Sequence, residues 1–273
     1  MKKSIITLLA LTLSLGLTAC GSSSTAEEST SEDGKTVVKV GVVGEYNAQW
    51  DTINELLADD GIEVELVKFT DYAAPNRALN DGEIDLNAFQ HKAFLANDIQ
   101  QNGYEIESIG DTIIAPLSIY NNKDKISSVE EIKDGDIIAI PSDLTNGGRA
   151  LKLLEAAGLI ECDPAKGYVP TKADITKYNV QIEILEAESA TLANLLPDCT
   201  AALINGGNAF TAGLNPNEDA IFTEDINPET NAATPDLINV IAARSEDKDN
   251  EVYQKIVEAY HSEEVRQTIE ESY

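Results

Sequence analysis

Residues 36–69 read TVVKVGVVGEYNAQWDTINELLADDGIEVELVKF, and the fold class can be predicted from this stretch. Residues 37–43 are rich in valine, which is typical of a buried strand in a parallel sheet. Residues 50–59 carry apolar side chains at helical spacing, and residues 62–69 return to a strand pattern. A strand, a helix and a second strand in this order favour an α/β fold with a parallel sheet and right-handed crossovers.

The same alternation continues beyond this stretch and restarts near the middle of the chain. Two successive α/β units, joined by extended segments, suggest two lobes connected by a hinge. Beyond residue 69, we expect strands or extended runs at 84–89, 113–120, 136–140, 180–185, 201–205 and 239–243, and helices at 75–80, 91–102, 129–132, 149–157, 190–196 and 252–262.

The composition excludes several classes of function. The chain has 48 acidic residues against 19 basic ones, a formal net charge of −29. Such a charge repels phosphate backbones and anionic lipid headgroups, so we expect no nucleic-acid binding and no polybasic membrane patch. With 2 histidines and 3 cysteines, the chain offers too few ligands for a multi-histidine zinc site. No nucleophile and base can be paired, and we expect neither an enzyme nor a metal or other cofactor.

The first 20 residues, MKKSIITLLALTLSLGLTAC, have the pattern of a signal peptide. Two lysines precede an apolar stretch that is too short for a permanent membrane span. The stretch ends in Leu17-Thr18-Ala19-Cys20, which resembles the lipobox of bacterial lipoproteins. This resemblance implies cleavage before Cys20, acylation of Cys20, and a lipid anchor in the membrane. The alternative is a plain secretory signal in which Cys20 falls at this position by chance.

Residues 21–35, GSSSTAEESTSEDGK, are small, polar or acidic and contain almost nothing apolar. Such a segment cannot bury enough surface to order itself, so we expect a flexible tether. The folded part is therefore expected on the extracytoplasmic face of the cell membrane, held there by the lipid on Cys20.

Arg149 is the first candidate for ligand binding. It follows Thr145-Asn146-Gly147-Gly148, and we expect it in the first turn of a helix that starts at this point. Free backbone N–H groups and the helix dipole favour an anion there, and a guanidinium can hold a carboxylate with two hydrogen bonds. The alternative is a surface arginine that pairs with one of the many acidic residues.

Other candidates follow the ends of predicted strands, where open α/β sheets bind ligands. Tyr72 follows the second strand, and Phe89 and His91 follow the third. Asn205 ends a later strand, and Asn239 opens the last one. Each has a structural alternative: a packed core aromatic, a histidine with internal partners, or a helix cap.

The two cysteines of the body, Cys162 and Cys199, leave two possibilities open. An extracytoplasmic protein can form a disulfide between them, or both can be isolated free thiols.

Several motifs together resemble the NlpA family of methionine-binding lipoproteins. The similarity covers residues 37–262. It is carried by Phe69-Thr70-Asp71-Tyr72, Gly82-Glu83-Ile84-Asp85-Leu86-Asn87, Phe89-Gln90-His91, Ile140-Pro141-Ser142-Asp143, Thr145-Asn146-Gly147-Gly148-Arg149-Ala150-Leu151, Ala202-Leu203-Ile204-Asn205, Ala212-Gly213-Leu214-Asn215-Pro216 and Asn239-Val240-Ile241-Ala242-Ala243-Arg244.

The resemblance implies a two-lobed periplasmic-binding-protein fold of type II, with a ligand cleft between lobes joined by a hinge. Lobe I is then expected to comprise residues 36–117 and 239–273, and lobe II residues 118–238. By the family's pattern, the residues that contact the ligand would be Arg149 and Asn146 for the carboxylate, Asn205 and Asn239 for the amino and carboxyl groups, and Tyr72, Phe89 and His91 for the side chain.

Two positions depart from the family's pattern. Ala88 stands where a second aromatic commonly precedes Gln-His, and Asn208 stands where an aromatic is common after the Asn205 motif. The residues for the amino-acid end are kept, while those for the ligand side chain differ.

The function implied is a lipoprotein that captures methionine, or a closely related amino acid or small peptide. It would deliver this ligand to the permease and ATPase of an ABC importer. The alternative is an extracytoplasmic sensor or surface interaction protein that uses the same fold without transport.

Overall fold

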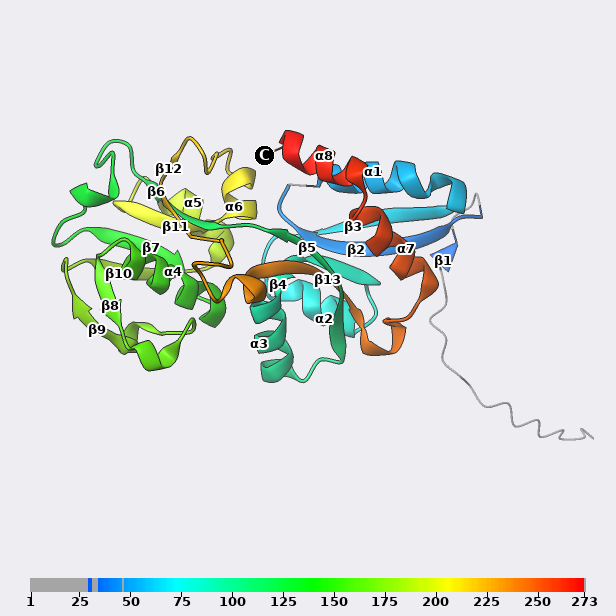
Figure 1. The fold of residues 1–273 in the computed structure, drawn as a ribbon, viewed down its shortest axis with the longest axis horizontal. Coiled ribbons are helices and arrows are strands. Elements are labelled where there is room, and N and C mark those ends of the chain that lie inside the picture. The colour runs from blue at the N-terminus through cyan, green and yellow to red at the C-terminus, as the bar shows by residue number, and fades with distance from the viewer. Residues whose placement is uncertain (1–28, 31–33, 46, 273) are drawn as a thin grey trace, which may run out of the picture.

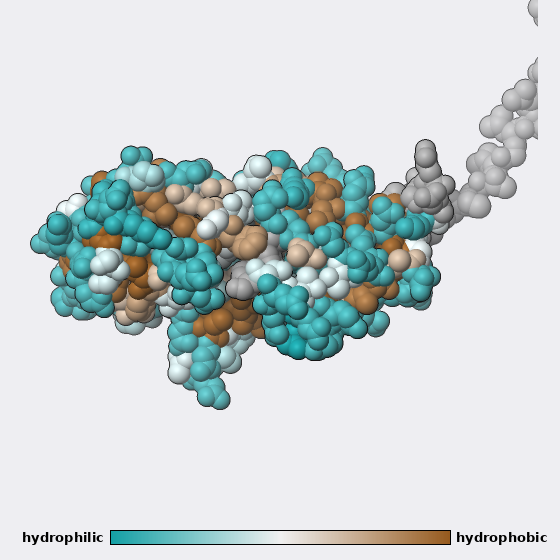
Figure 2. Space-filling model, turned by 90° about the horizontal axis from the view of Figure 1, so that it is seen from above, coloured by the Kyte–Doolittle hydropathy of each residue, from teal (hydrophilic) through white to brown (hydrophobic). Residues whose placement is uncertain are grey.

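The computed structural model describes residues 29–30, 34–45 and 47–272 and contains two α/β lobes that lie side by side (Figure 1). The predicted signal peptide, Cys20 and most of the predicted tether lie outside the described residues. Within the described part of the chain, no helix has the length and apolar character needed to cross a membrane. Hydrophilic residues predominate on the face shown in Figure 2, as expected from the acidic composition.

Lobe I is built on a six-stranded sheet in which β2 pairs with β1, β3 and β4, and β13 pairs with β4 and β5. Helices α1, α7 and α8 cover one face of this sheet, and α2 and α3 cover the other (Figure 1). The elements are β1 (Ser29–Thr30), β2 (Thr36–Val43), α1 (Ala48–Leu57), β3 (Ile62–Phe69), α2 (Ala74–Asn80), β4 (Leu86–His91), α3 (Lys92–Asn102), β5 (Ile106–Ile114), β13 (Ile238–Arg244), α7 (Glu251–Tyr260) and α8 (Glu263–Ser272).

Lobe II is built on a five-stranded sheet of order β10-β7-β11-β6-β12, with a separate hairpin formed by β8 and β9. Helix α4 packs on one face of this sheet, and α5 and α6 pack on the other. The elements are β6 (Leu117–Asn121), β7 (Ile137–Pro141), α4 (Leu144–Ala156), β8 (Ile160–Cys162), β9 (Ile175–Tyr178), β10 (Glu183–Ala187), α5 (Leu192–Leu195), β11 (Ala201–Asn205), α6 (Gly206–Thr211) and β12 (Ala220–Thr223). Short 3-10 helices are Ala58–Asp60, Val129–Glu131, Pro164–Lys166, Lys172–Asp174, Ser189–Thr191, Thr234–Leu237 and Ser245–Asp247.

The chain passes between the lobes twice. It leaves lobe I between β5 and β6, and it returns between β12 and β13. The predicted α/β class and the two-lobed arrangement are confirmed, while the residue bounds given above for the lobes stay a prediction.

The predicted parallel pairing is confirmed for the strands of the first stretch, since β2 runs parallel to β3 and β4, but both sheets are mixed. β13 runs antiparallel to both β4 and β5, and β6 runs antiparallel to β11 and β12. These strands lie next to the crossings between the lobes, so they enter their sheets without a preceding crossover helix. The strand pattern at 106–112 was missed because glycine and polar residues interrupt its alternation, so the expected run at 113–120 is in fact the end of β5 followed by β6.

The helix predicted over 149–157 begins five residues earlier, at Leu144. Asp143 caps it, because its Oδ1 accepts a hydrogen bond from the backbone N–H of Asn146 at 2.9 Å. Two glycines inside a helix usually indicate a loop, but here packing requires them. A Cβ on Gly148 would lie 2.8 Å from the carbonyl oxygen of Tyr168, and one on Gly147 would lie 2.9 Å from that of Pro141. Arg149 therefore lies in the second turn and not at the helix N-terminus.

Cys162 and Cys199 are free thiols, so the disulfide alternative is wrong. They are buried on opposite faces of the lobe II sheet, Cys162 in the core under α4 and Cys199 in the core under α5.

Candidate functional site

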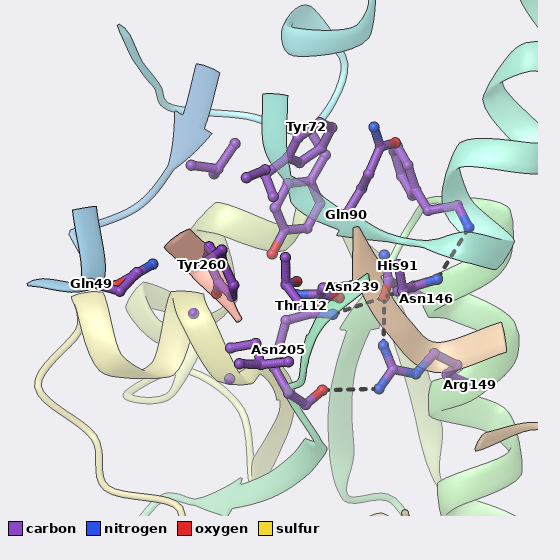
Figure 3. Close-up of a pocket in the computed structure, with 18 residues that line it drawn as sticks. Gln49, Tyr72, Gln90, His91, Thr112, Asn146, Arg149, Asn205, Asn239 and Tyr260 are labelled. Carbon is purple, nitrogen blue, oxygen red and sulfur yellow. Dashed lines mark hydrogen bonds between the residues drawn. The ribbon is translucent and has the colours of Figure 1, made fainter. Parts of the chain in front are cut away.

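A cavity between the lobes brings together all seven residues predicted to contact a ligand (Figure 3). Their positions are now known, but their contact with a ligand stays a prediction. The residues that line the cavity are Val43, Gln49, Tyr72, Ala88, Phe89, Gln90, His91, Phe94, Thr112, Ile113, Ala115, Asn146, Arg149, Asn205, Gly206, Gly207, Asn239 and Tyr260.

One wall of the cavity is aromatic and belongs to lobe I. Tyr72 lies after β3, Phe89 lies in β4, and Phe94 lies in the first turn of α3. Their ring centroids are 5.9–6.0 Å apart, with Phe94 edge-on to both other rings. Burial raises the pKa of the Tyr72 hydroxyl, which keeps it protonated. Such a wall favours an apolar or thioether side chain. Phe94 lies within the helix predicted over 91–102, where its apolar side chain gives no sign of a position in the cavity.

His91 caps α3 and also reaches across to lobe II. Its Nδ1 accepts a hydrogen bond from the backbone N–H of Phe94 at 3.1 Å, which places the proton of the neutral ring on Nε2. That Nε2–H donates to Asn146 Oδ1 at 3.3 Å. Burial and the nearby charge of Arg149 lower the pKa of His91 to about 3. The histidine is therefore a neutral hydrogen-bond donor at ordinary pH.

Three donors converge on a single oxygen, Oδ1 of Asn146. Besides His91, Asn205 Nδ2 donates to it at 2.8 Å and Arg149 Nη1 at 3.4 Å. The Asn146 amide is held in place because its Nδ2 donates to both oxygens of Asp143 at 3.1 Å. An amide oxygen has two lone pairs, so three donors exceed what it can satisfy well. The same group of N–H donors is suited to a carboxylate oxygen.

Arg149 is buried and paired, in a way that sequence reasoning did not foresee. Its Nε and Nη2 donate to the two carboxylate oxygens of Glu224 at 3.2 and 2.5 Å. Nη2 also donates to the carbonyl oxygen of Ala115 at 3.2 Å. The guanidinium fork expected to hold a ligand carboxylate thus holds Glu224. The alternative, an arginine paired with an acidic residue, is correct about the partner. It is wrong about the location, because the pair is buried and not on the surface. No local signal could link residues 75 positions apart.

Two buried amide oxygens at the cavity have no hydrogen-bond donor among the described residues. They are Oδ1 of Asn205 and Oε1 of Gln49. A buried unpaired acceptor costs about 1–3 kcal/mol, so both oxygens favour a ligand that brings N–H groups. Asn205 precedes α6 but makes no side-chain cap, so the cap alternative is wrong for it. Gln49, the second residue of α1, was missed because it directly precedes the helix predicted over 50–59 and there resembles a polar loop residue.

Asn239 lies next to His91, because the two residues pair in the ladder between β13 and β4. Both side chains line the cavity (Figure 3).

Comparison with known proteins places this arrangement in a family, because the family model described as NlpA lipoprotein matches residues 38–273. The chain belongs to the NlpA lipoprotein family. It is 39% identical over 260 residues to the D-methionine-binding lipoprotein MetQ of Salmonella typhimurium, covering 94% of this chain and 90% of that protein.

Two solved structures are also similar to this NlpA-family chain. One is the substrate-binding protein of a methionine transporter from Streptococcus pneumoniae, with a TM-score of 0.81, 36% identity, and coverage of 87% of this chain and 93% of that one. The other is a nutrient-binding protein from Burkholderia cenocepacia bound to methionine, with a TM-score of 0.79, 35% identity, and coverage of 85% and 95%. These relatives confirm the resemblance, the two-lobed substrate-binding fold, and the prediction of a binding protein that is not an enzyme.

The two departures from the NlpA-family pattern have different places in the structure. Ala88 lines the cavity with a methyl group and also packs against the core under α1 and α7. Asn208 is not among the lining residues, but its Nδ2 donates to the hydroxyl of Tyr72 at 3.0 Å. This bond joins α6 of lobe II to the aromatic wall of lobe I.

Proposed function

We propose that this chain is a membrane-tethered, extracytoplasmic solute-binding protein that captures methionine or a closely related amino acid and delivers it to an ABC importer. The observation that carries the proposal is one buried cavity in which convergent N–H donors, unpaired acceptor oxygens and an aromatic wall occur together.

The carboxylate of the amino acid would bind where donors are in excess. His91 Nε2, Asn205 Nδ2 and Arg149 Nη1 share one acceptor, Asn146 Oδ1, so a carboxylate placed beside that oxygen would find donors in reach. Asn146 would support this end by keeping its donors in position. The ammonium group would bind where acceptors are in excess, at Asn205 Oδ1 and Gln49 Oε1. Asn239, beside His91, would contact the same polar groups of the ligand.

The side chain of the amino acid would lie against Tyr72, Phe89 and Phe94. Each sulfur–aromatic contact would contribute about 0.3–1.5 kcal/mol. Because Ala88 presents only a methyl group to the cavity, side chains related to that of methionine would also be candidates.

Lobe I would comprise residues 36–117 and 239–273, and lobe II residues 118–238. Hydrogen bonds that cross between them close the cavity: His91 with Asn146, Asn208 with Tyr72, and the backbone N–H of Glu45 with Thr211 Oγ1 at 3.1 Å. Because these bonds hold the lobes together over the cavity, we expect binding to follow an opening and closing of the lobes about the two crossings.

Delivery would require the chain to remain close to the importer. Cleavage before Cys20 and acylation of that residue would anchor the protein to the extracytoplasmic face of the cell membrane, with residues 21–35 as the tether. The permease and its ATPase would then receive the ligand from the closed, ligand-bound protein.

The test is a calorimetric titration of residues 21–273, unfolded and refolded beforehand to remove any bound ligand. The panel contains L- and D-methionine, the other amino acids and short methionine peptides. We expect saturable heat with methionine or with an amino acid of similar side chain, and a stabilisation of about 2.7 kcal/mol at a ligand excess of 100 times Kd. No heat with any member of the panel would contradict the proposal.

A further inference from the structure

The charges at the cavity are arranged in an unusual way for a site that binds a carboxylate. Among the described residues that line it, Arg149 is the only one that carries a charge, since the low pKa of His91 keeps that ring neutral. The acid that neutralises Arg149 does not line the cavity. Glu224 lies directly behind the guanidinium, with 7% of its side chain exposed against 4% for Arg149.

Glu224 is fixed by the crossings between the lobes. It follows β12, at the point where the chain leaves lobe II, and its backbone N–H donates to the carbonyl oxygen of Leu117 at 2.9 Å. The backbone N–H of Leu117 in turn donates to Glu224 Oε2 at 3.2 Å. Ala115, which also binds Arg149, lies in the other crossing, and Leu117 begins β6 directly after it. The carboxylate therefore cannot turn toward the ligand, and it holds the guanidinium in one orientation.

The hydrogen bonds of Arg149 show what is left for a ligand. Nε and both Nη2 hydrogens are taken by Glu224 and Ala115, and one Nη1 hydrogen points to Asn146. Of the five N–H donors of a guanidinium, one is left, on the Nη1 edge. A ligand carboxylate therefore meets this edge, while Glu224 keeps the fork.

We infer that Glu224 is a positioning residue that also sets the charge selectivity of the site. With Glu224 in place, Arg149 and Glu224 together carry no net charge, so a net-neutral zwitterion enters without leaving a charge uncompensated. A simple carboxylate without an ammonium group brings one uncompensated negative charge beside this buried, already balanced pair, where that charge is disfavoured. Two other acids, Asp143 and Glu188, act on Tyr72 of the cavity; Asp143 is half-buried, and N–H groups of Asn146 bind its oxygens. This inference rests on the proposed function.

The direct test replaces Glu224 by the isosteric, neutral glutamine. Calorimetric competition measures the Kd of L-methionine and of 4-(methylsulfanyl)butanoate, which keeps the side chain and carboxylate of methionine but lacks the ammonium group. In Glu224→Gln the charge of Arg149 is no longer balanced by its paired acid, so we expect the affinity for the butanoate relative to methionine to rise at least tenfold. A purely structural role would weaken both ligands by the same factor, and an unchanged ratio would overturn the inference.

Two further comparisons complete the test: one is a control variant, and the other replaces Glu224→Gln if that variant does not fold. Glu263→Gln removes an acid from an exposed pair with Arg266, and we expect the wild-type ratio in that variant. If Glu224→Gln leaves Arg149 unpaired and the protein does not fold, Arg149→Gln is compared with the double variant Arg149→Gln/Glu224→Gln. Removing Glu224 in this background should again raise the relative affinity for the butanoate at least tenfold, and an equal ratio in the two proteins would refute the inference.

The failure of the proposed function would be visible separately. In that case the wild-type protein gives no heat with methionine or any other amino acid. If the wild-type protein binds a different amino acid, that amino acid and its analogue without the ammonium group replace the two probes.

Discussion

Low pH should destabilise this protein through His91, and this contribution to the free energy of unfolding can be measured separately from that of the other ionisable groups. In the folded chain the pKa of His91 is about 3, below its ordinary value of 6.5, because burial and the charge of Arg149 disfavour the imidazolium form. Between these two pH values the unfolded chain binds a proton that the folded chain does not. The stabilisation that depends on a neutral His91 is therefore complete above pH 6.5 and is lost progressively as the pH falls toward 3.

The size of the effect follows from the same two values. At pH 5.0 the solution is 1.5 units below the ordinary pKa and still well above the folded-state pKa. Each unit corresponds to about 1.4 kcal/mol, so the free energy of unfolding should fall by ~2 kcal/mol between pH 7.5 and 5.0 through this residue alone. The full difference would be reached only below pH 3.

The assay compares urea unfolding of the wild-type protein and of His91→Gln at pH 7.5 and 5.0. Carboxylates titrate in both proteins and cancel in the difference. We expect the difference in unfolding free energy, wild type minus variant, to decrease by ~2 kcal/mol on acidification. His261→Gln controls for the loss of a histidine from the unfolded chain, since both variants lose one there. Parallel pH dependences of the wild type and His91→Gln would show that the histidine is not held neutral between the lobes, and the tautomer assignment would fail with it.

Three further predictions concern binding and packing. Arg149→Ala should weaken methionine binding by about 2–5 kcal/mol in calorimetry, because a buried charged contact is lost, whereas Arg77→Ala on the exposed face of α2 should leave Kd unchanged. Equal affinities of the two variants would remove Arg149 from the site. Asn208→Ala removes the bond to the Tyr72 hydroxyl and should weaken binding by about 0.5–1.5 kcal/mol; an unaltered Kd would mean that this bond does not contribute to closure. Gly148→Ala places a Cβ within 2.8–2.9 Å of neighbouring backbone and should lower the melting temperature, unlike Gly207→Ala, whose Cβ meets open space.

Local sequence patterns predicted secondary structure correctly in segments whose own residues determine their conformation. The valine-rich run at 37–43 and the apolar spacing of 50–59 gave a strand and a helix close to where they lie. The start of α4 could not be predicted in this way, because Gly147 and Gly148 weaken a helix locally and are required only by neighbouring segments that pack against them. Helix propensity depends only on the residues of the segment itself. A prediction from propensity therefore fails where packing against other segments determines which residue is needed.

The candidate residues were found one by one, but the network that joins them was not. Each was expected near the end of a strand or helix, where polar and aromatic side chains often bind ligands, although Arg149 in fact lies in the second turn of α4. Glu224 carries no such signal, since it is one acid among 48 and its partner Arg149 lies 75 positions away. Gln49 was missed for a similar reason, because only the cavity shows that its oxygen is buried without a donor.

Hydrogen-bond satisfaction explains why this cavity would select an amino acid over other small apolar molecules. At one end, three donors share the single oxygen of Asn146, and one N–H of Arg149 is left over. Gln49, on the side of the cavity away from Arg149, and Asn205 each leave a buried oxygen without a donor (Figure 3). A zwitterion supplies acceptors to the first group and donors to the second. An apolar molecule of the same shape supplies neither, and the unpaired groups would then be desolvated at a cost of about 1–3 kcal/mol each. Because Glu224 already balances Arg149, the ligand that satisfies both groups is also one that carries no net charge.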